Sequence, residues 1–210
     1  DEAVTPRLYE EIVRTTLVSR HDAYRIASKM MFFGQWLRFA GMYPTYQVRL
    51  GRKGAFRFKQ VGHGQREDIS PERVGSLMEP YLHYSFSKGL VEWLEKHNRY
   101  STDEAYEAMR QLKCAARLDW RALLSIDATR RRRALKQLAV RLPCRPTLRF
   151  LYMYVLRLGF LDGKPGLIYC RLLALYEYMI VLKTRELQLS QRAHSPKDLS
   201  SRQSSRDQLS

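Results

Sequence analysis

The stretch MEPYLHYSFSKGLVEWLEKHNRYS, at residues 78–101, marks a change from strands to helices. On its amino-terminal side, residues 75–84 have the apolar and aromatic content of a strand. From Ser85 onward, apolar and aromatic residues recur at the spacing of one helix face, and these residues are Leu90, Trp93, Leu94 and His97. The sequence therefore predicts an α/β fold class, with a sheet-containing first part and an all-helical second part.

Upstream of this stretch, residues 6–19 predict a short amphipathic helix. Residues 23–39 are rich in β-type and aromatic side chains and predict a strand with a bend at Gly34. Over residues 43–50, apolar or aromatic side chains alternate with polar ones well enough to predict a second strand.

Glycines divide the next segment. The Gly51-Arg52-Lys53-Gly54 sequence is typical of a turn, and we expect residues 55–58 to return as the partner of the preceding strand. Residues 61–69 contain two glycines and predict a loop.

Downstream, Ser101-Thr102-Asp103-Glu104 has the form of a capping box and predicts the start of a new helix. Residues 130–142 predict a basic helix. Two apolar helices, at 147–158 and 167–187, flank a glycine-containing turn. The polar, serine-rich segment after residue 187 predicts disorder. We expect a sheet-containing part at 1–84, a helical part at 85–187 and a disordered tail at 188–210.

The composition is strongly basic, with 37 Lys and Arg against 21 Asp and Glu and a net charge of +16. Such a charge favours anionic partners, which include phosphates, an acidic membrane face and nucleic acid. Cys114, Cys144 and Cys170 are odd in number and form no CxxC pair, so neither a zinc site nor a disulfide framework is expected.

The 78–101 stretch, taken with Gly159-Phe160-Leu161-Asp162-Gly163-Lys164-Pro165-Gly166, resembles the carboxyl-terminal half of bacterial family 2 glycosyltransferases. The closest subgroup is the one that builds lipopolysaccharide core or other envelope polysaccharides. The resemblance implies that residues 1–84 are the second half of a GT-A-type nucleotide-sugar transferase domain with a mixed sheet. It also implies that the nucleobase-binding strands precede Asp1, so this piece alone is expected to be inactive.

The resemblance also implies site residues. Asp1 corresponds to the last aspartate of an acidic motif that holds Mg²⁺ or Mn²⁺ at the donor diphosphate, and His83 to a residue of the same metal or diphosphate region. Lys88 is expected to neutralise phosphate. Either Glu67 or Asp68 is expected to be the general base, and the sequence leaves the choice open. Each of these residues also has a purely structural interpretation. Asp1 can be an acid near a helix start, and Glu67 and Asp68 can belong to a charged surface loop. His83 can be an ordinary buried histidine, and Lys88 a solvated surface lysine.

The implied function is inverting transfer of a sugar from a nucleotide-sugar donor to a lipid-linked or polysaccharide acceptor. Trp36, Tyr43, Tyr46 and Arg49 are expected on the acceptor side. The polybasic run at 130–133 and the apolar helices predict a peripheral location on the anionic inner face of the cell membrane. The alternative is a non-catalytic basic module that binds anionic membrane or RNA. Nucleic acid is not expected, because no RNA-binding aromatic signature or helix-turn-helix pattern occurs.

Overall fold

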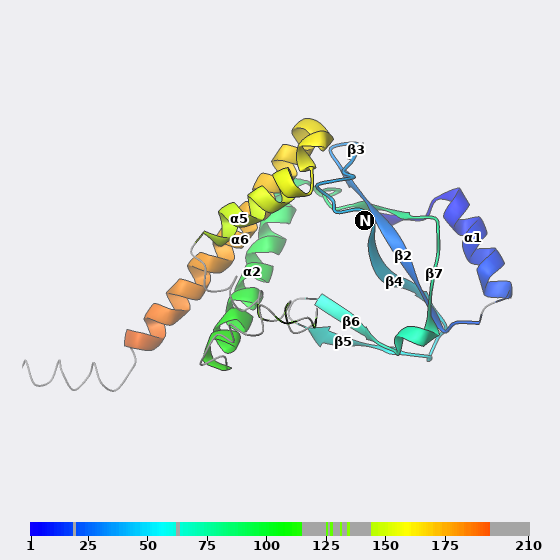
Figure 1. Cartoon of the computed structure of the whole chain (residues 1–210), viewed down its shortest axis with the longest axis horizontal. Helices are drawn as coiled ribbons and strands as arrows, with labels where there is room; N and C mark the ends of the chain where they lie inside the picture. Colours follow the sequence, from blue (N-terminus) through cyan, green and yellow to red (C-terminus); the bar gives the residue numbers. More distant parts are fainter. Residues whose placement is uncertain are drawn as a thin grey trace, which may run out of the picture. The chain divides into compact units, whose positions relative to one another are not determined.

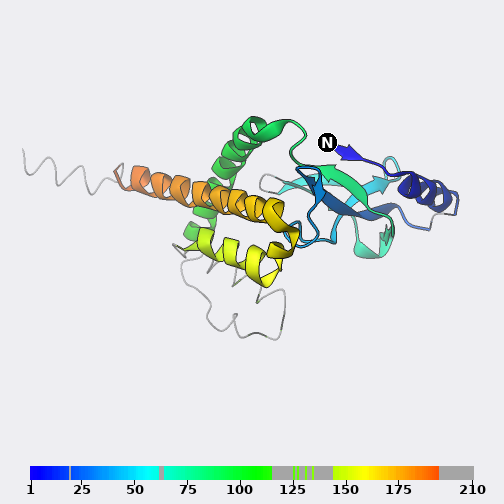
Figure 2. The same ribbon diagram turned by 90° about the horizontal axis from the view of Figure 1, so that it is seen from above.

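The computed structural model describes residues 1–18, 20–61, 64–114, 125, 127, 131, 134 and 144–193 (Figures 1 and 2). The chain is α/β, with a mixed six-stranded sheet, a separate two-stranded sheet and a carboxyl-terminal helical region. It divides into two compact units. One comprises residues 1–97 with 147–175, and the other comprises residues 98–146 with 176–210.

The central strand of the large sheet is β2 (Ala23–Phe32). Along one edge it pairs antiparallel with β4 (Thr45–Gly51) and with the short β3 (Gln35–Trp36). Phe33 and Gly34 both have positive φ, 48° and 76°, which closes a tight turn between β2 and β3. The predicted bend at Gly34 is therefore confirmed, and it is sharp enough to reverse the chain.

Along its other edge β2 pairs in parallel with β7 (Val74–Ser76) and β8 (Tyr81–Tyr84), and β1 (Glu2–Ala3) adds to β8 antiparallel. The single strand expected over residues 75–84 is thus two strands. The short 3₁₀ helix η1 (Pro71–Arg73) leads into the first of them.

The two-stranded sheet corrects two predictions. Strand β5 (Arg57–Val61) pairs with β6 (Gly64–Asp68) and not with β4, whose partner is β2. Residues 64–68, expected to be part of a loop, form the second strand of this hairpin. Gly62 and His63, also predicted as loop, lie outside the described residues.

Helix α1 (Pro6–Leu17) covers part of one face of the large sheet. Thr5 caps it, with its side-chain oxygen accepting a hydrogen bond from the Leu8 amide at 3.2 Å. Leu8 is fully buried and packs against a core cluster of sheet-side residues, which are Tyr24, Ile26, Leu77 and Tyr81. Figure 1 shows α1 beside β7. The predicted amphipathic helix is confirmed.

Helix α2 (Gly89–Cys114) runs without interruption through the predicted capping box. Ser101 is buried, and its hydroxyl donates to the carbonyl of Asn98 within the helix instead of capping a new one. The prediction of a helix start at this point is therefore wrong.

The helical hairpin starts with α5 (Arg145–Leu151) and the π-helical turn η2 (Tyr152–Leu156), and returns through the 3₁₀ helix η3 (Gly159–Asp162) into α6 (Gly163–Ala193). Helix α6 continues past residue 187, where a disordered tail was expected, and residues 194–210 lie outside the described part. The expected basic helix at 130–142 also lies outside it, except for Arg131 and Ala134, which are helical.

The hairpin contributes to the second core cluster, which joins Phe32, Leu37 and Ala40 of the sheet side to Met153, Tyr169 and Cys170. Within the described residues, Gly159–Gln191 is long and apolar enough to cross a membrane by length and composition alone. The same property is found in core helices of soluble proteins.

Candidate functional site

The β1–β8 pair brings the two acidic residues at the start of the chain, Asp1 and Glu2, next to the strand that carries His83. Glu2 lies directly opposite His83 in the antiparallel register, and the Tyr84 amide donates to the Asp1 carbonyl at 2.8 Å. Directly opposed residues share a face of the sheet, so Glu2 is the carboxylate that faces His83. Asp1 precedes the strand by one residue and lies exposed at its end.

Glu2 has a second partner that the sequence did not predict. Its Oε1 atom accepts from Nη2 of Arg49 at 2.6 Å, and Arg49 comes from β4, on the far side of the central strand. Both side chains are about 40% exposed, so this ion pair orders the site more than it stabilises the fold. The guanidinium also lies 5.8 Å from the ring centroid of Tyr81.

Burial lowers the pKa of His83 below its usual value. The positive charges of Arg49 and Lys96 lower the pKa further, and the carboxylate of Glu2 opposes them. The imidazole is therefore neutral at neutral pH. A neutral ring retains one nitrogen lone pair, which can accept a hydrogen bond or bind a metal ion. Tyr81 supports the same strand, since its hydroxyl donates to Oε1 of Gln47 at 3.1 Å.

Within the described ranges, no group of three or more His, Cys, Asp or Glu side chains lies close enough together to hold a metal ion. Mg²⁺ usually keeps several waters and takes only one or two carboxylates besides the phosphates of its substrate. At the β1–β8 edge the described residues offer the carboxylates of Asp1 and Glu2 and the imidazole of His83, and Glu2 is already paired with Arg49.

The two candidate bases lie in the separate hairpin. Glu67 is paired opposite Phe58, and Asp68 opposite Arg57. As consecutive strand residues they point to opposite faces, so the two cannot both face one substrate hydroxyl. Oδ2 of Asp68 also lies 2.7 Å from Nζ of Lys59. Glu67 is exposed on the face that carries Phe58.

The structure places Lys88 at the turn before α2, where its ammonium group lies 3.3 Å from Oε1 of Glu92. Both side chains are exposed, and an ion pair of this spacing on a helix contributes little to stability. Its role at a phosphate stays a prediction. Of the residues expected on the acceptor side, Trp36 and Tyr43 are in edge-to-face contact at 5.1 Å. Arg49 instead belongs to the pair with Glu2.

Asp162 belongs to the glycine-rich motif at residues 159–166, and its carboxylate is only 3% exposed and fully hydrogen-bonded. Oδ1 accepts from the amide of Arg38 at 3.1 Å, and Oδ2 accepts from the amides of Phe39 and Ala40 at 2.9 and 2.7 Å. The backbone oxygen of Asp162 accepts from the Gln35 side chain at 3.0 Å. The η3 turn is thereby attached to the chain that follows β3 (Figure 1).

The glycines of this motif allow close backbone packing. A Cβ atom at Gly166 would collide with the carbonyl of Gly159 and lie 2.7 Å from Cβ of Asp162. A Cβ atom at Gly159 would lie 2.7 Å from the Met153 carbonyl and 3.2 Å from Sγ of Cys170. The motif is therefore a structural clamp between the helical hairpin and residues 35–40.

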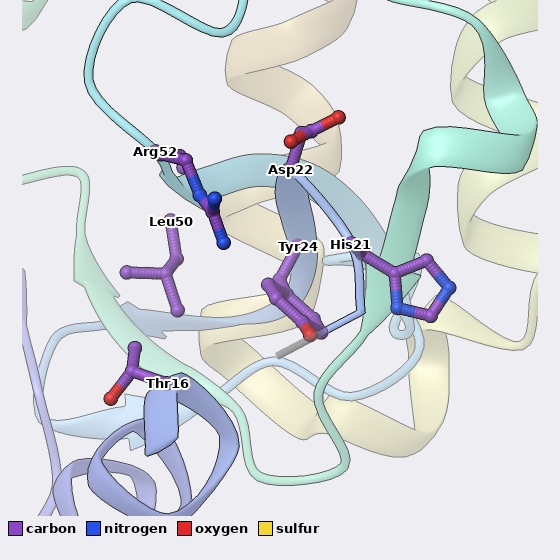
Figure 3. Close-up of a pocket in the computed structure, with 7 residues that line it drawn as sticks. Thr16, His21, Asp22, Tyr24, Leu50 and Arg52 are labelled. Carbon is purple, nitrogen blue, oxygen red and sulfur yellow. The ribbon is translucent and has the colours of Figure 1, made fainter. Parts of the chain in front are cut away.

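A pocket of about 180 Å³ lies elsewhere in the same unit, at the end of α1 (Figure 3). Thr16, Leu50 and Arg52 surround the Tyr24 ring, and His21 contacts the ring edge-on at 5.5 Å. Pockets that hold small molecules usually measure about 300–1,000 Å³. This pocket is therefore too small for a nucleotide sugar, and it contains none of the predicted site residues.

No known protein-family model matches this chain, and no solved structure matches it.

Proposed function

We propose that this chain is part of an inverting glycosyltransferase of the GT-A type. The observation that carries the proposal is the β1–β8 pair, which holds an acidic dipeptide beside a strand-borne histidine in a mixed sheet. Acidic residues at a strand end suit the diphosphate of a sugar nucleotide when a divalent cation lies between them. The basic charge of the chain suits a substrate of that kind.

In the proposed reaction, an acceptor hydroxyl attacks the anomeric carbon of the donor sugar. The new C–O bond forms as the bond to the diphosphate breaks, and the nucleoside diphosphate leaves with the bonding electron pair. The hydroxyl proton passes to a carboxylate. Asp1 and His83 would hold Mg²⁺ or Mn²⁺, which supplies positive charge to the departing diphosphate.

Glu67 is the better candidate for the base. Asp68 is already engaged in an ion pair with Lys59, which it would have to leave to reach an acceptor hydroxyl. Glu67 lies on the face with the exposed ring of Phe58, and an aromatic face of this kind suits a sugar.

The location we propose is the inner face of the cell membrane, with a lipid-linked or polysaccharide acceptor. The segment from η2 through η3 exposes large apolar side chains, including Leu156 at 74% and Leu161 at 55%. Arg157 and Lys164 beside them are exposed and basic, and the acid in this stretch, Asp162, is buried. Apolar and basic side chains together favour an anionic lipid interface.

The test uses the complete gene product with uridine- and guanosine-diphosphate sugars, Mn²⁺ and membranes containing bacterial envelope glycolipids. Release of nucleoside diphosphate and the mass of the glycolipid would be measured. We expect Glu67→Gln to lose turnover while donor affinity is kept, because a base acts on the chemical step. Asp68→Asn is the matched control and should stay active. Full activity of Glu67→Gln would refute this assignment, and absence of transfer from every donor would refute the function.

A further inference from the structure

A second polar cluster lies around Trp36. Trp36 pairs with Met31 across the β2–β3 hairpin, and Lys29 precedes Met31 by two residues, so all three share one face of the sheet. Nζ of Lys29 lies 4.6 Å from the Trp36 ring centroid, and Cζ of Arg38 lies 5.9 Å from it. Two cationic groups thus lie close to one indole ring.

Within the described part of the chain, none of the donor groups in this cluster has a carboxylate partner. Nε1 of Trp36 is buried, and no acceptor for it occurs among the described residues. Lys29 and Arg38 have no carboxylate partner within the described ranges, whereas Arg49, Arg73 and Lys59 each have one there. Indole N–H, ammonium and guanidinium groups donate hydrogen bonds and accept none. The complement of the cluster is therefore a negatively charged oxygen group.

The backbone around Arg38 is held in place before any ligand binds. The buried carboxylate of Asp162 accepts the amides of Arg38, Phe39 and Ala40. The carbonyl of Arg38 in turn accepts from the Tyr43 amide at 3.1 Å. The side chain of Tyr43 then contacts the ring of Trp36 edge-on. Asp162 is thus a positioning residue, because it fixes the backbone from which the Arg38 side chain extends.

We propose that Lys29, Trp36 and Arg38 form a binding site for an oxyanion, a phosphate or carboxylate group carried by a saccharide. The guanidinium and ammonium groups supply charge-assisted hydrogen bonds, and the indole N–H supplies a neutral one. That the anion belongs to a saccharide rests on the proposed glycosyltransferase function. The site then assigns a class of acceptor, namely a sugar that bears a negative charge.

The experiment follows the indole N–H resonances of the 210-residue chain, labelled with ¹⁵N at tryptophan, by NMR. The Trp36 signal is assigned from its loss in Trp36→Phe. Inorganic phosphate, glucose 6-phosphate, glucuronate and glucose are the probes. We expect the Trp36 signal to shift with the anionic probes and to stay in place with glucose. Shifts with both anionic sugars indicate a general anion site, and a shift with the phosphates alone indicates a phosphate site.

Arg38→Gln and Lys29→Gln should each weaken glucose 6-phosphate binding about tenfold, as expected for loss of a charged hydrogen bond. Lys53→Gln, on the exposed β4–β5 turn, removes the same charge and should leave the affinity unchanged. Asp162→Asn should weaken binding while the protein stays folded at low temperature. An unmoved Trp36 signal at about 10 mM probe, an equal response to glucose, or unchanged binding in both charge variants would overturn the proposal.

The outcome is independent of catalysis. Anion binding by the chain, together with no sugar transfer by the complete gene product, would refute the proposed function and keep this site. Sugar transfer that does not depend on Lys29 and Arg38, with no Trp36 shift, would refute the site and keep the function.

Discussion

Replacing Asp162 with Asn tests whether the glycine-rich motif is a clamp. In the parent protein three backbone amides donate to one buried carboxylate. The Asn side chain would direct its oxygen toward Phe39 and Ala40, where two bonds are kept. Its NH₂ group would then face the amide of Arg38, which places two donors together. The change therefore removes one charge-assisted bond, weakens two others and leaves a buried amide unpaired.

Hydrogen bonds to charged groups contribute about 1.5–3 kcal/mol each, and an unsatisfied buried donor costs about 1–3 kcal/mol. Because the two remaining bonds offset part of this loss, we expect the free energy of unfolding to fall by about 2–4 kcal/mol. With a urea slope near 2 kcal/mol per molar, the midpoint should fall by about 1–2 M.

Urea unfolding followed by circular dichroism measures this difference. Hydrogen exchange should localise it, with protection lost first at the amides of Arg38, Phe39 and Ala40. Asp103→Asn, at an exposed position in α2, is the matched control and should change stability by less than about 0.5 kcal/mol. An equally small effect of Asp162→Asn would refute the clamp.

Three further changes test other parts of the structure. Gly166→Ala should destabilise by about 1–3 kcal/mol in urea unfolding, because the new methyl group meets the carbonyl of Gly159; parent-like stability would contradict this packing. Burial raises the pKa of the Cys170 thiol to about 11, so the stability gained from the protonated thiol is complete below about pH 8.5 and is lost as the pH rises through 11. The urea midpoint should fall more steeply over that interval in the parent than in Cys170→Ala, and equal slopes would argue against it. Leu161→Glu should weaken binding to vesicles of phosphatidylglycerol and phosphatidylcholine about tenfold. Leu17→Glu, at an exposed position of α1, should leave vesicle binding unchanged. An equal loss of binding in both variants would exclude the η2–η3 segment as the membrane contact.

The general character of the fold could be predicted from the sequence, because it depends on local patterns. Three expected elements occur in the structure. They are the strand predicted from the alternating residues 43–50, the amphipathic helix that begins at Pro6, and the turn at Gly34. Strand pairing could not be predicted in the same way. The Gly51–Gly54 turn suggested a hairpin between β4 and residues 55–58, but β4 pairs with β2, and this long-range choice is set by burial of Val48 and Ile26.

Two local signals were misleading for physical reasons. The capping box at residues 101–104 lies inside a helix because tertiary packing buries Ser101 and its neighbour Ala105, and packing overrides cap preference. The two glycines at 62 and 64 suggested a loop, but Gly64 is the first residue of β6 and pairs with Val61.

The candidate site was only partly predictable. The sequence placed Asp1 and His83 in one region through a family resemblance, and the β1–β8 register puts Glu2, the residue after Asp1, opposite His83. The Arg49 contact with Glu2 spans the central strand and leaves no pattern in the sequence. Asp162 lies far along the chain from the amides that it binds, and only the closely spaced glycines around it indicate a special backbone.

The most direct test of the central claim, a divalent-cation and diphosphate site at the β1–β8 edge, is paramagnetic broadening by Mn²⁺. Mn²⁺ with uridine diphosphate would be titrated into the protein carrying labelled histidines, and the imidazole signals would be followed by NMR. The account predicts that His83 broadens first, well before His21 and His97, and that Asp1→Asn reduces this effect. Equal broadening of His21, His83 and His97, or an unaffected His83, would contradict it.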